Sequence, residues 1–194
     1  MNFVGPRLLC IAFLSLLLAL PAFSGCAPKS RIPENVLDTP RHHASTGFKL
    51  IKKGYLYDAD REFNLAVELD PHYSPAYLGL GLVYGIRRDF KKAFEAMGSA
   101  KDYAKDKEDK ALACMGFMRL YSMQKANGWL KDAEGSFLEA IGYVKDLPEA
   151  YYYMGIAYED ANRINESRKA FEKVLEINKR LVPEAHEALG RMKK

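Results

Sequence analysis

Cysteine is scarce in this sequence, with three among 194 residues. Cys10 lies inside an apolar N-terminal run and Cys26 closely follows that run, so Cys114 is the only cysteine of the remaining chain. A lone cysteine excludes an internal disulfide and a thiolate metal cluster there. Because Cys114 stands beside methionines on a predicted helix, we expect it to be a small buried packing residue and not a nucleophile.

A long run of like charge is also missing. The formal net charge is +4, from 29 Lys and Arg against 25 Asp and Glu, and the signs are mixed along most of the predicted helices. Nucleic-acid-binding proteins usually carry a clustered basic stripe, so we expect no nucleic-acid partner. With 48% hydrophobic and 28% charged residues, the composition is that of a globular protein.

The sequence lacks the motifs that would indicate an enzyme. It has no glycine-rich phosphate loop, no His-Glu-x-x-His helix and no nucleophile elbow. The four histidines are interpreted as surface residues: His42, His43, His72 and His186. The adjacent pair cannot chelate together, because neighbouring residues on a helix point apart. We therefore predict no catalytic site, no metal and no cofactor.

The first 25 residues have the pattern of an export signal. Arg7 precedes an apolar run from residue 8 to residue 20, which Pro21 ends. The run is too short to cross a bilayer comfortably, since a spanning helix takes about 20 residues. The following segment, Ala22-Phe23-Ser24-Gly25-Cys26, resembles the lipobox of bacterial lipoproteins. The resemblance implies cleavage before Cys26 and lipidation of that cysteine.

The residue after the predicted lipidation site bears on the membrane. Position 27 is alanine, in place of the aspartate that often retains lipoproteins in the inner membrane, which favours the periplasmic face of the outer membrane. The alternative is ordinary signal cleavage to give a soluble exported protein. Residues 26–39 are interpreted as the lipidated cysteine and a flexible tether, which as a coil would span about 20 Å.

From Pro40 onward the sequence repeats with a period of 34 residues. Leu80-Gly81-Leu82-Val83-Tyr84 followed by Ala93 carries the pattern most clearly, and it resembles the tetratricopeptide repeat. The resemblance implies an all-α, right-handed solenoid of four helix pairs with a capping helix. The predicted units are repeats 40–73, 74–107, 114–147 and 148–181, a helical insertion 108–113 and a cap 182–194.

The departures from the pattern make local predictions. Gly54, Gly128 and Asn162 share one place in three units, where left-handed backbone ends a helix. Arg88 occupies that place in the second unit, so its turn is either differently shaped or strained. We also expect a first helix that packs loosely, a splayed third pair because Tyr121 replaces a small residue, and a long helix over about 108–127.

The resemblance further implies that the first helix of each pair lines a concave groove. The candidate protein-binding residues are Phe48, Ile51, Leu78, Leu82, Met118, Tyr152, Ile156 and Glu159. An open apolar face of this kind is typical of a recognition surface. The alternative is that some of these side chains pack against neighbouring repeats or the cap. Arg41 and Lys52 at one end and acidic residues 149, 159 and 160 at the other would give the groove a direction.

These patterns predict a non-enzymatic, membrane-anchored scaffold of the bacterial cell envelope, whose groove binds other envelope proteins. The pattern that holds a C-terminal carboxylate in some relatives is absent, since Phe48 and Leu82 occupy its asparagine-type positions. The alternative is a structural protein that self-assembles into homo-oligomers through its first repeat.

Overall fold

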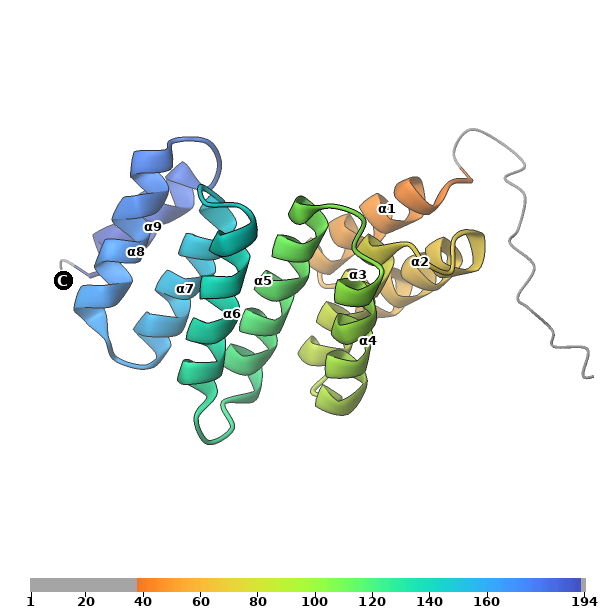
Figure 1. The fold of residues 1–194 in the computed structure, drawn as a ribbon, viewed down its shortest axis with the longest axis horizontal. Coiled ribbons are helices and arrows are strands. Elements are labelled where there is room, and N and C mark those ends of the chain that lie inside the picture. The colour runs from red at the N-terminus through yellow and green to blue at the C-terminus, as the bar shows by residue number, and fades with distance from the viewer. Residues whose placement is uncertain (1–37, 193–194) are drawn as a thin grey trace, which may run out of the picture.

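The computed structural model describes residues 38–192. The predicted signal, Cys26 and most of the predicted tether lie outside these residues. The described part is a row of helices with no strand in it (Figure 1). The helices are α1 Pro40–Lys52, α2 Leu56–Leu69, α3 Ser74–Ile86, α4 Phe90–Asp102, α5 Lys107–Gln124, α6 Trp129–Tyr143, α7 Pro148–Asp160, α8 Ile164–Ile177 and α9 Val182–Arg191.

Local sequence signals set the helix starts. Thr39 caps α1, because its hydroxyl accepts a hydrogen bond from the backbone N–H of His42 at 3.1 Å. Asp89 and Asp106 cap α4 and α5 in the same way. Proline occupies the first turn of α1, α3, α7 and α9, where its missing N–H breaks no helical hydrogen bond.

Each turn inside the four pairs has a left-handed residue at the place that the repeat predicts. The predictions for Gly54 and Gly128 are confirmed, with φ of 80° and 81°, and Asn162 has φ of 59°. Arg88 also has a positive φ, of 64°, so of the two alternatives the strained turn is the one observed. A side chain with a Cβ destabilises this conformation by about 1–2 kcal/mol relative to right-handed backbone.

The first helix is well packed, which contradicts the expected looseness. The Phe63 ring of α2 is fully buried between α1 and α3, and the backbone at Gly47 and Gly79 approaches it from the two sides. Phe48 of α1 packs edge-to-face on the same ring, at 5.0 Å between centroids. Self-assembly through a loosely packed first repeat therefore loses its support.

The expected splaying of the third pair is wrong as well. The contact between α5 and α6 is the most extensive between any two helices of residues 38–192. Tyr121 does not force this pair apart, because its ring lies against Phe94 of the preceding α4, at 5.1 Å between centroids. Ala133 and Ala140 of α6 are fully buried against α5 and α7.

The α5 and α9 helices lie where the sequence places the helical insertion and the cap. The α5 helix has 18 residues and ends three residues before the expected end, where Lys125 turns left-handed with φ of 52°. The cap helix α9 buries Ala185 and Ala188 against Phe171 and Val174 of α8. It thereby covers the apolar end of the array, as a terminal helix must for solubility.

The array curves around its first helices. Neighbours among α1, α3, α5 and α7 contact one another in succession, whereas α2, α4, α6 and α8 make no comparable contacts among themselves. The first helices therefore form the inner, concave side, where the candidate residues were predicted to lie.

Candidate protein-binding site

Three of the predicted groove residues do not face an open groove. Leu78 is 7% exposed, Leu82 is 4% exposed, and Met118 is fully buried. The prediction that these three side chains offer apolar surface to a partner is therefore wrong. The reason is that α3 and α5 each pack against first helices on both sides. In addition, α3, which carries Leu78 and Leu82, is apolar around most of its circumference.

The remaining apolar candidates stay partly exposed, namely Phe48 and Ile51 of α1 and Tyr152 and Ile156 of α7. Phe48 and Ile51 pack against the cluster that contains Leu78 and Leu82. The concave surface is thus filled in its middle and open toward its ends. Two cavities lie there.

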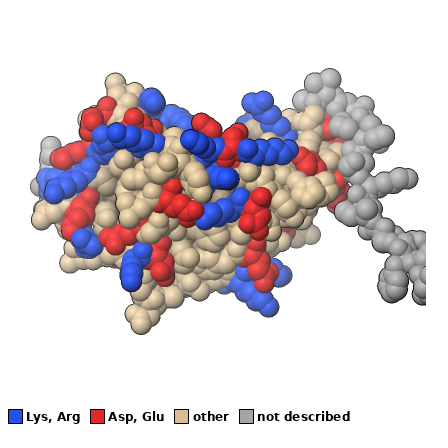
Figure 2. All heavy atoms as spheres, in the orientation of Figure 1, with Lys and Arg blue, Asp and Glu red and all other residues tan. Residues whose placement is uncertain are grey.

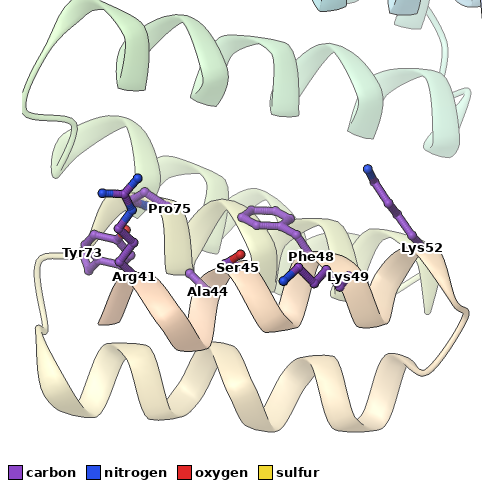
Figure 3. A pocket seen from close by; sticks show the side chains of 8 residues that line it. All are labelled: Arg41, Ala44, Ser45, Phe48, Lys49, Lys52, Tyr73 and Pro75. Atoms are coloured by element: carbon purple, nitrogen blue, oxygen red, sulfur yellow. The ribbon is translucent and has the colours of Figure 1, made fainter. Parts of the chain in front are cut away.

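The first cavity lies between α1 and the start of α3 and has a volume of about 400 Å³ (Figure 3). Its lining residues are Arg41, Ala44, Ser45, Phe48, Lys49, Lys52, Tyr73 and Pro75. Small or compact side chains at positions 44 and 75 leave a hollow between the larger rings of Phe48 and Tyr73. This volume is within the range of about 300–1,000 Å³ that is typical of ligand pockets.

This cavity has cations around it and no acidic residue in its lining. Arg41 and Lys52 stand at its two ends, and Lys49 lies beside Phe48 (Figure 3). Burial raises the pKa of the Tyr73 hydroxyl, while the nearby Arg41 guanidinium acts in the opposite direction. The basic end of the predicted polarity is therefore present.

The second cavity lies between α5 and α7 and has a volume of about 210 Å³. The Arg119 guanidinium lies 4.5 Å from the centre of the Tyr153 ring, a cation–π contact that forms one wall. Ile156 and Met123 provide apolar surface, and Asp160 closes one end. Tyr153, whose role the sequence left undecided, is thus the tyrosine of α7 that lines this cavity.

Tyr152 faces the cap instead of this cavity. Its ring packs on Phe171 at 5.5 Å between centroids and belongs to the cluster that holds α9. Burial raises the pKa of its hydroxyl, as does the nearby Glu184 of α9. The alternative that groove residues pack against the cap is the observed one for Tyr152.

The acidic end of the predicted polarity is neutralised within the chain. Glu149 pairs with Arg180 at 2.9 Å, Glu159 with Arg191 at 3.5 Å, and Asp160 with Lys125 at 3.1 Å. Glu159, predicted to contact a partner, is thus already engaged by the cap helix. Figure 2 shows the same interleaving of acidic and basic side chains over the face in view. A direction set by opposite charges at the two ends is not what the structure has.

One histidine is not a surface residue. The Nδ1 atom of His43 lies 2.7 Å from Glu62 Oε2, and its Nε2 atom lies 3.1 Å from Asp38 Oδ1, with the side chain 15% exposed. Burial lowers the pKa of His43, but the hydrogen bonds to Glu62 and Asp38 outweigh it and raise the pKa overall. The surface interpretation of His43 is wrong, while His42, His72 and His186 are exposed as predicted. The available signal was its place in the repeat, where the family has a large packing residue.

Neither a cluster of metal ligands nor an exposed thiol occurs among the described residues. No group of three or more metal-ligating side chains occurs among residues 38–192. Cys114 is 1% exposed, which confirms the predicted packing role, and burial raises its thiol pKa to about 12. A thiol with that pKa holds almost no thiolate at neutral pH. No helix within the described part is long and apolar enough to cross a membrane.

Comparisons with known proteins identify the architecture. The tetratricopeptide repeat family matches residues 148–181, which are α7, α8 and the turn after them. A structure of PilF from Pseudomonas aeruginosa is similar, with 19% identity and a TM-score of 0.61 over 79% of this chain and 67% of that chain. A comparison with curated proteins gave no match.

A second structural neighbour is larger. The crystal structure of the APC/C hetero-tetramer Cut9–Hcn1 matches with 15% identity and a TM-score of 0.59, over 81% of this chain and 30% of that chain. At these identities the likeness shows the fold alone. The predicted all-α solenoid of tetratricopeptide repeats is confirmed, and this fold is one of interaction scaffolds.

Proposed function

We propose that this chain is a lipid-anchored scaffold of the bacterial cell envelope, which binds another envelope protein through its concave face. The observation that carries the proposal is the open cavity between α1 and α3, where Phe48 provides an apolar floor beside cations that pair with no acidic residue of the described part. A concave apolar surface with a few polar groups at its rim suits binding.

The anchoring part of the proposal is supported by the sequence. The apolar run after Arg7 and the lipobox-like residues before Cys26 resemble those of an exported lipoprotein. Acyl chains contribute about 0.8 kcal/mol for each buried CH₂, so more than one chain anchors a protein stably without a spanning helix. The 13 residues from 27 to 39 would let the repeats stand off the membrane surface.

Site-directed photo-crosslinking in intact cells tests the binding role. A crosslinking amino acid at Ser45, which is exposed beside the cavity, should capture a discrete envelope protein. The matched control is Glu95, an exposed residue of α4, which is the second helix of its pair and lies outside the concave side. A crosslinking amino acid at Glu95 should not capture that protein. Identical crosslinks from the two positions, or none from Ser45, would contradict the role of the concave face.

Membrane fractionation tests the anchor. Cys26→Ser removes the thiol that lipidation requires, so the variant should move from the membrane fraction to the soluble exported fraction. The unaltered chain, expressed at the same level, is the control. A variant that stays with the membrane would refute lipid anchoring through Cys26 and leave the binding role standing.

A further inference from the structure

The cavity between α1 and α3 carries a more specific inference, which rests on the proposed binding role of the concave face. The basic residues that line this cavity lack the ion pairs that many other basic residues of the described part form. Arg87, Lys105 and Lys125 each bridge to an acidic residue of another helix or turn, at 3.1–3.6 Å. No described acidic residue pairs with the three basic residues of the cavity. These residues all lie on α1 and are Arg41, Lys49 and Lys52.

The composition of α1 explains why these cations have no described acidic partner. The helix contains no acidic residue, and the two carboxylates that approach it, Asp38 and Glu62, are bound to His43. His43 itself does not line the cavity. Positive charge therefore collects on the concave side of α1, and among residues 38–192 no acidic residue lines the cavity beside it.

The floor between these charges is apolar and firmly held. Phe48 packs edge-to-face on the fully buried Phe63, so its ring has little freedom to close the hollow. Ala44 and Pro75 keep the space beside the ring open. A floor of this kind favours one bulky apolar side chain, which would lose its contact with water on entering.

The spacing of the charges gives the length of the ligand. Arg41 and Lys52 are eleven residues apart on α1, which at about 1.5 Å per residue places them roughly 16 Å apart along the axis. An extended chain covers that distance in about five residues, at about 3.3 Å each. We propose that this cavity binds an extended acidic segment of a partner protein, with one bulky apolar side chain between its acidic ends.

An anionic membrane surface is the other negatively charged partner that an envelope protein could bind. The concave shape of the cavity favours the acidic peptide segment over the membrane. A bilayer presents a broad, gently curved surface whose headgroups would reach the exposed lysine tips but leave the hollow at Ala44 and Phe48 unfilled. A peptide side chain fills that hollow. The membrane is accordingly the competing outcome of the test.

Fluorescence anisotropy with the purified full-length chain tests the proposal. The probe is the labelled peptide Glu-Asp-Phe-Asp-Glu, compared with Glu-Asp-Ser-Asp-Glu and Lys-Lys-Phe-Lys-Lys. We expect the first peptide to bind and the other two to bind at least about tenfold more weakly, since each lacks one of the two complementary features. Binding should weaken further as added salt screens the charges.

Charge reversal locates the site. Arg41→Glu combined with Lys52→Glu should weaken binding of the first peptide about tenfold or more. The matched control combines Lys91→Glu with Lys131→Glu, which makes the same change in net charge on α4 and α6 and should alter binding by less than about twofold. All four side chains are exposed, and circular dichroism checks that both variants keep their helices.

The results that would contradict the peptide proposal differ from those that would contradict the scaffold role. Equal binding to the two double variants, or equal binding of the serine peptide, would overturn the proposed specificity while leaving crosslinks from Ser45 intact. Vesicles of phosphatidylglycerol and phosphatidylcholine form the last arm. If the first peptide does not bind, and the vesicles bind the unaltered chain but not the Arg41→Glu/Lys52→Glu variant, the basic face serves the membrane and the peptide proposal is overturned.

Discussion

Replacing Gly79 with alanine should destabilise the array, although alanine is the better helix former. A Cβ atom at Gly79 would lie 2.1 Å from Phe63 Cε1 and 2.2 Å from Phe63 Cζ. The ring would have to move by about an ångström to restore ordinary van der Waals contact. Little room is left toward α1, because the backbone at Gly47 packs so close to the same ring that a Cβ added there would lie 2.7 Å from it.

The magnitude follows from two opposing contributions. Overpacking a closed core site costs about 1–3 kcal/mol. Alanine in the interior of a helix is more favourable than glycine by about 1 kcal/mol, which offsets part of that cost. The free energy of unfolding should therefore fall by up to about 2 kcal/mol in Gly79→Ala.

Gly135 provides the matched control. It lies in the interior of α6 and is exposed, and a Cβ there would meet nothing within 4 Å. Gly135→Ala should therefore raise the free energy of unfolding by about 0.5–1 kcal/mol. Urea unfolding followed by circular dichroism measures both variants, and an unchanged dependence on urea shows that the same cooperative unit unfolds.

The double variant Gly79→Ala/Phe63→Leu tests the contact itself. The smaller leucine leaves room for the added methyl group, so the two changes should be coupled by about 0.5–3 kcal/mol in a double-mutant cycle. A Gly79→Ala variant as stable as Gly135→Ala, or two strictly additive changes, would refute the placement of the Phe63 ring between the two glycines.

Further predictions concern single residues. Arg88→Gly should raise the free energy of unfolding by about 0.5–1 kcal/mol in the same urea assay, because glycine adopts φ of 64° without strain; a loss of stability would show that the Arg88 side chain contributes more than the strain costs. The raised pKa of His43 should make its stabilising contribution full below about pH 6.5 and lost as the pH rises through the folded-state value; a His43→Gln variant with a parallel pH profile of stability would contradict this. Cys114 should escape alkylation at about pH 8 in the folded chain and react once urea unfolds it, as judged by mass spectrometry of the Cys114 peptide.

The fold was predictable because its signals are local and repeated. A period of 34 residues placed each helix pair, and the residues at 54, 128 and 162 marked the same turn in three of them. Arg88 breaks the residue rule but not the geometry, since the flanking helices require the left-handed turn whatever residue occupies it. The repeat therefore predicted the left-handed backbone of the turn more reliably than it predicted the strain at Arg88.

The candidate site was less predictable, because exposure on the concave side depends on both neighbours of a helix. Leu78 and Leu82 have the spacing of groove residues, but the depth at which α3 lies between α1 and α5 is a property of the assembled array. Packing at the third pair was misjudged for a related reason, since the Tyr121 ring turns toward the previous repeat. The environment of His43 was also mispredicted. This α1 residue pairs with Glu62 of α2, and the spacing of residues within α1 gives no sign of a contact between helices.

The position of a helix in the row explains where the open surface lies. An interior first helix such as α3 has neighbours on both sides, and its concave residues are buried between them. At the C-terminal end α9 takes Tyr152 and Glu159 into its own contacts. At the N-terminal end α1 contacts α3 on one side only, and among the described residues no helix precedes it.

The least covered concave surface is consequently that of α1, fifteen residues after Cys26 at Arg41. If Cys26 is the anchor, a partner bound at this cavity is held next to the membrane and not at the far end of the array. Lengthening the tether by a Gly/Ser insertion after Pro33 should then leave peptide affinity in solution unchanged, because the cavity is unaltered. The same insertion should reduce crosslinking from Ser45 to a membrane-bound partner, since the effective concentration falls as the linker grows beyond the span. Unchanged crosslinking would show that the partner reaches the cavity independently of the anchor.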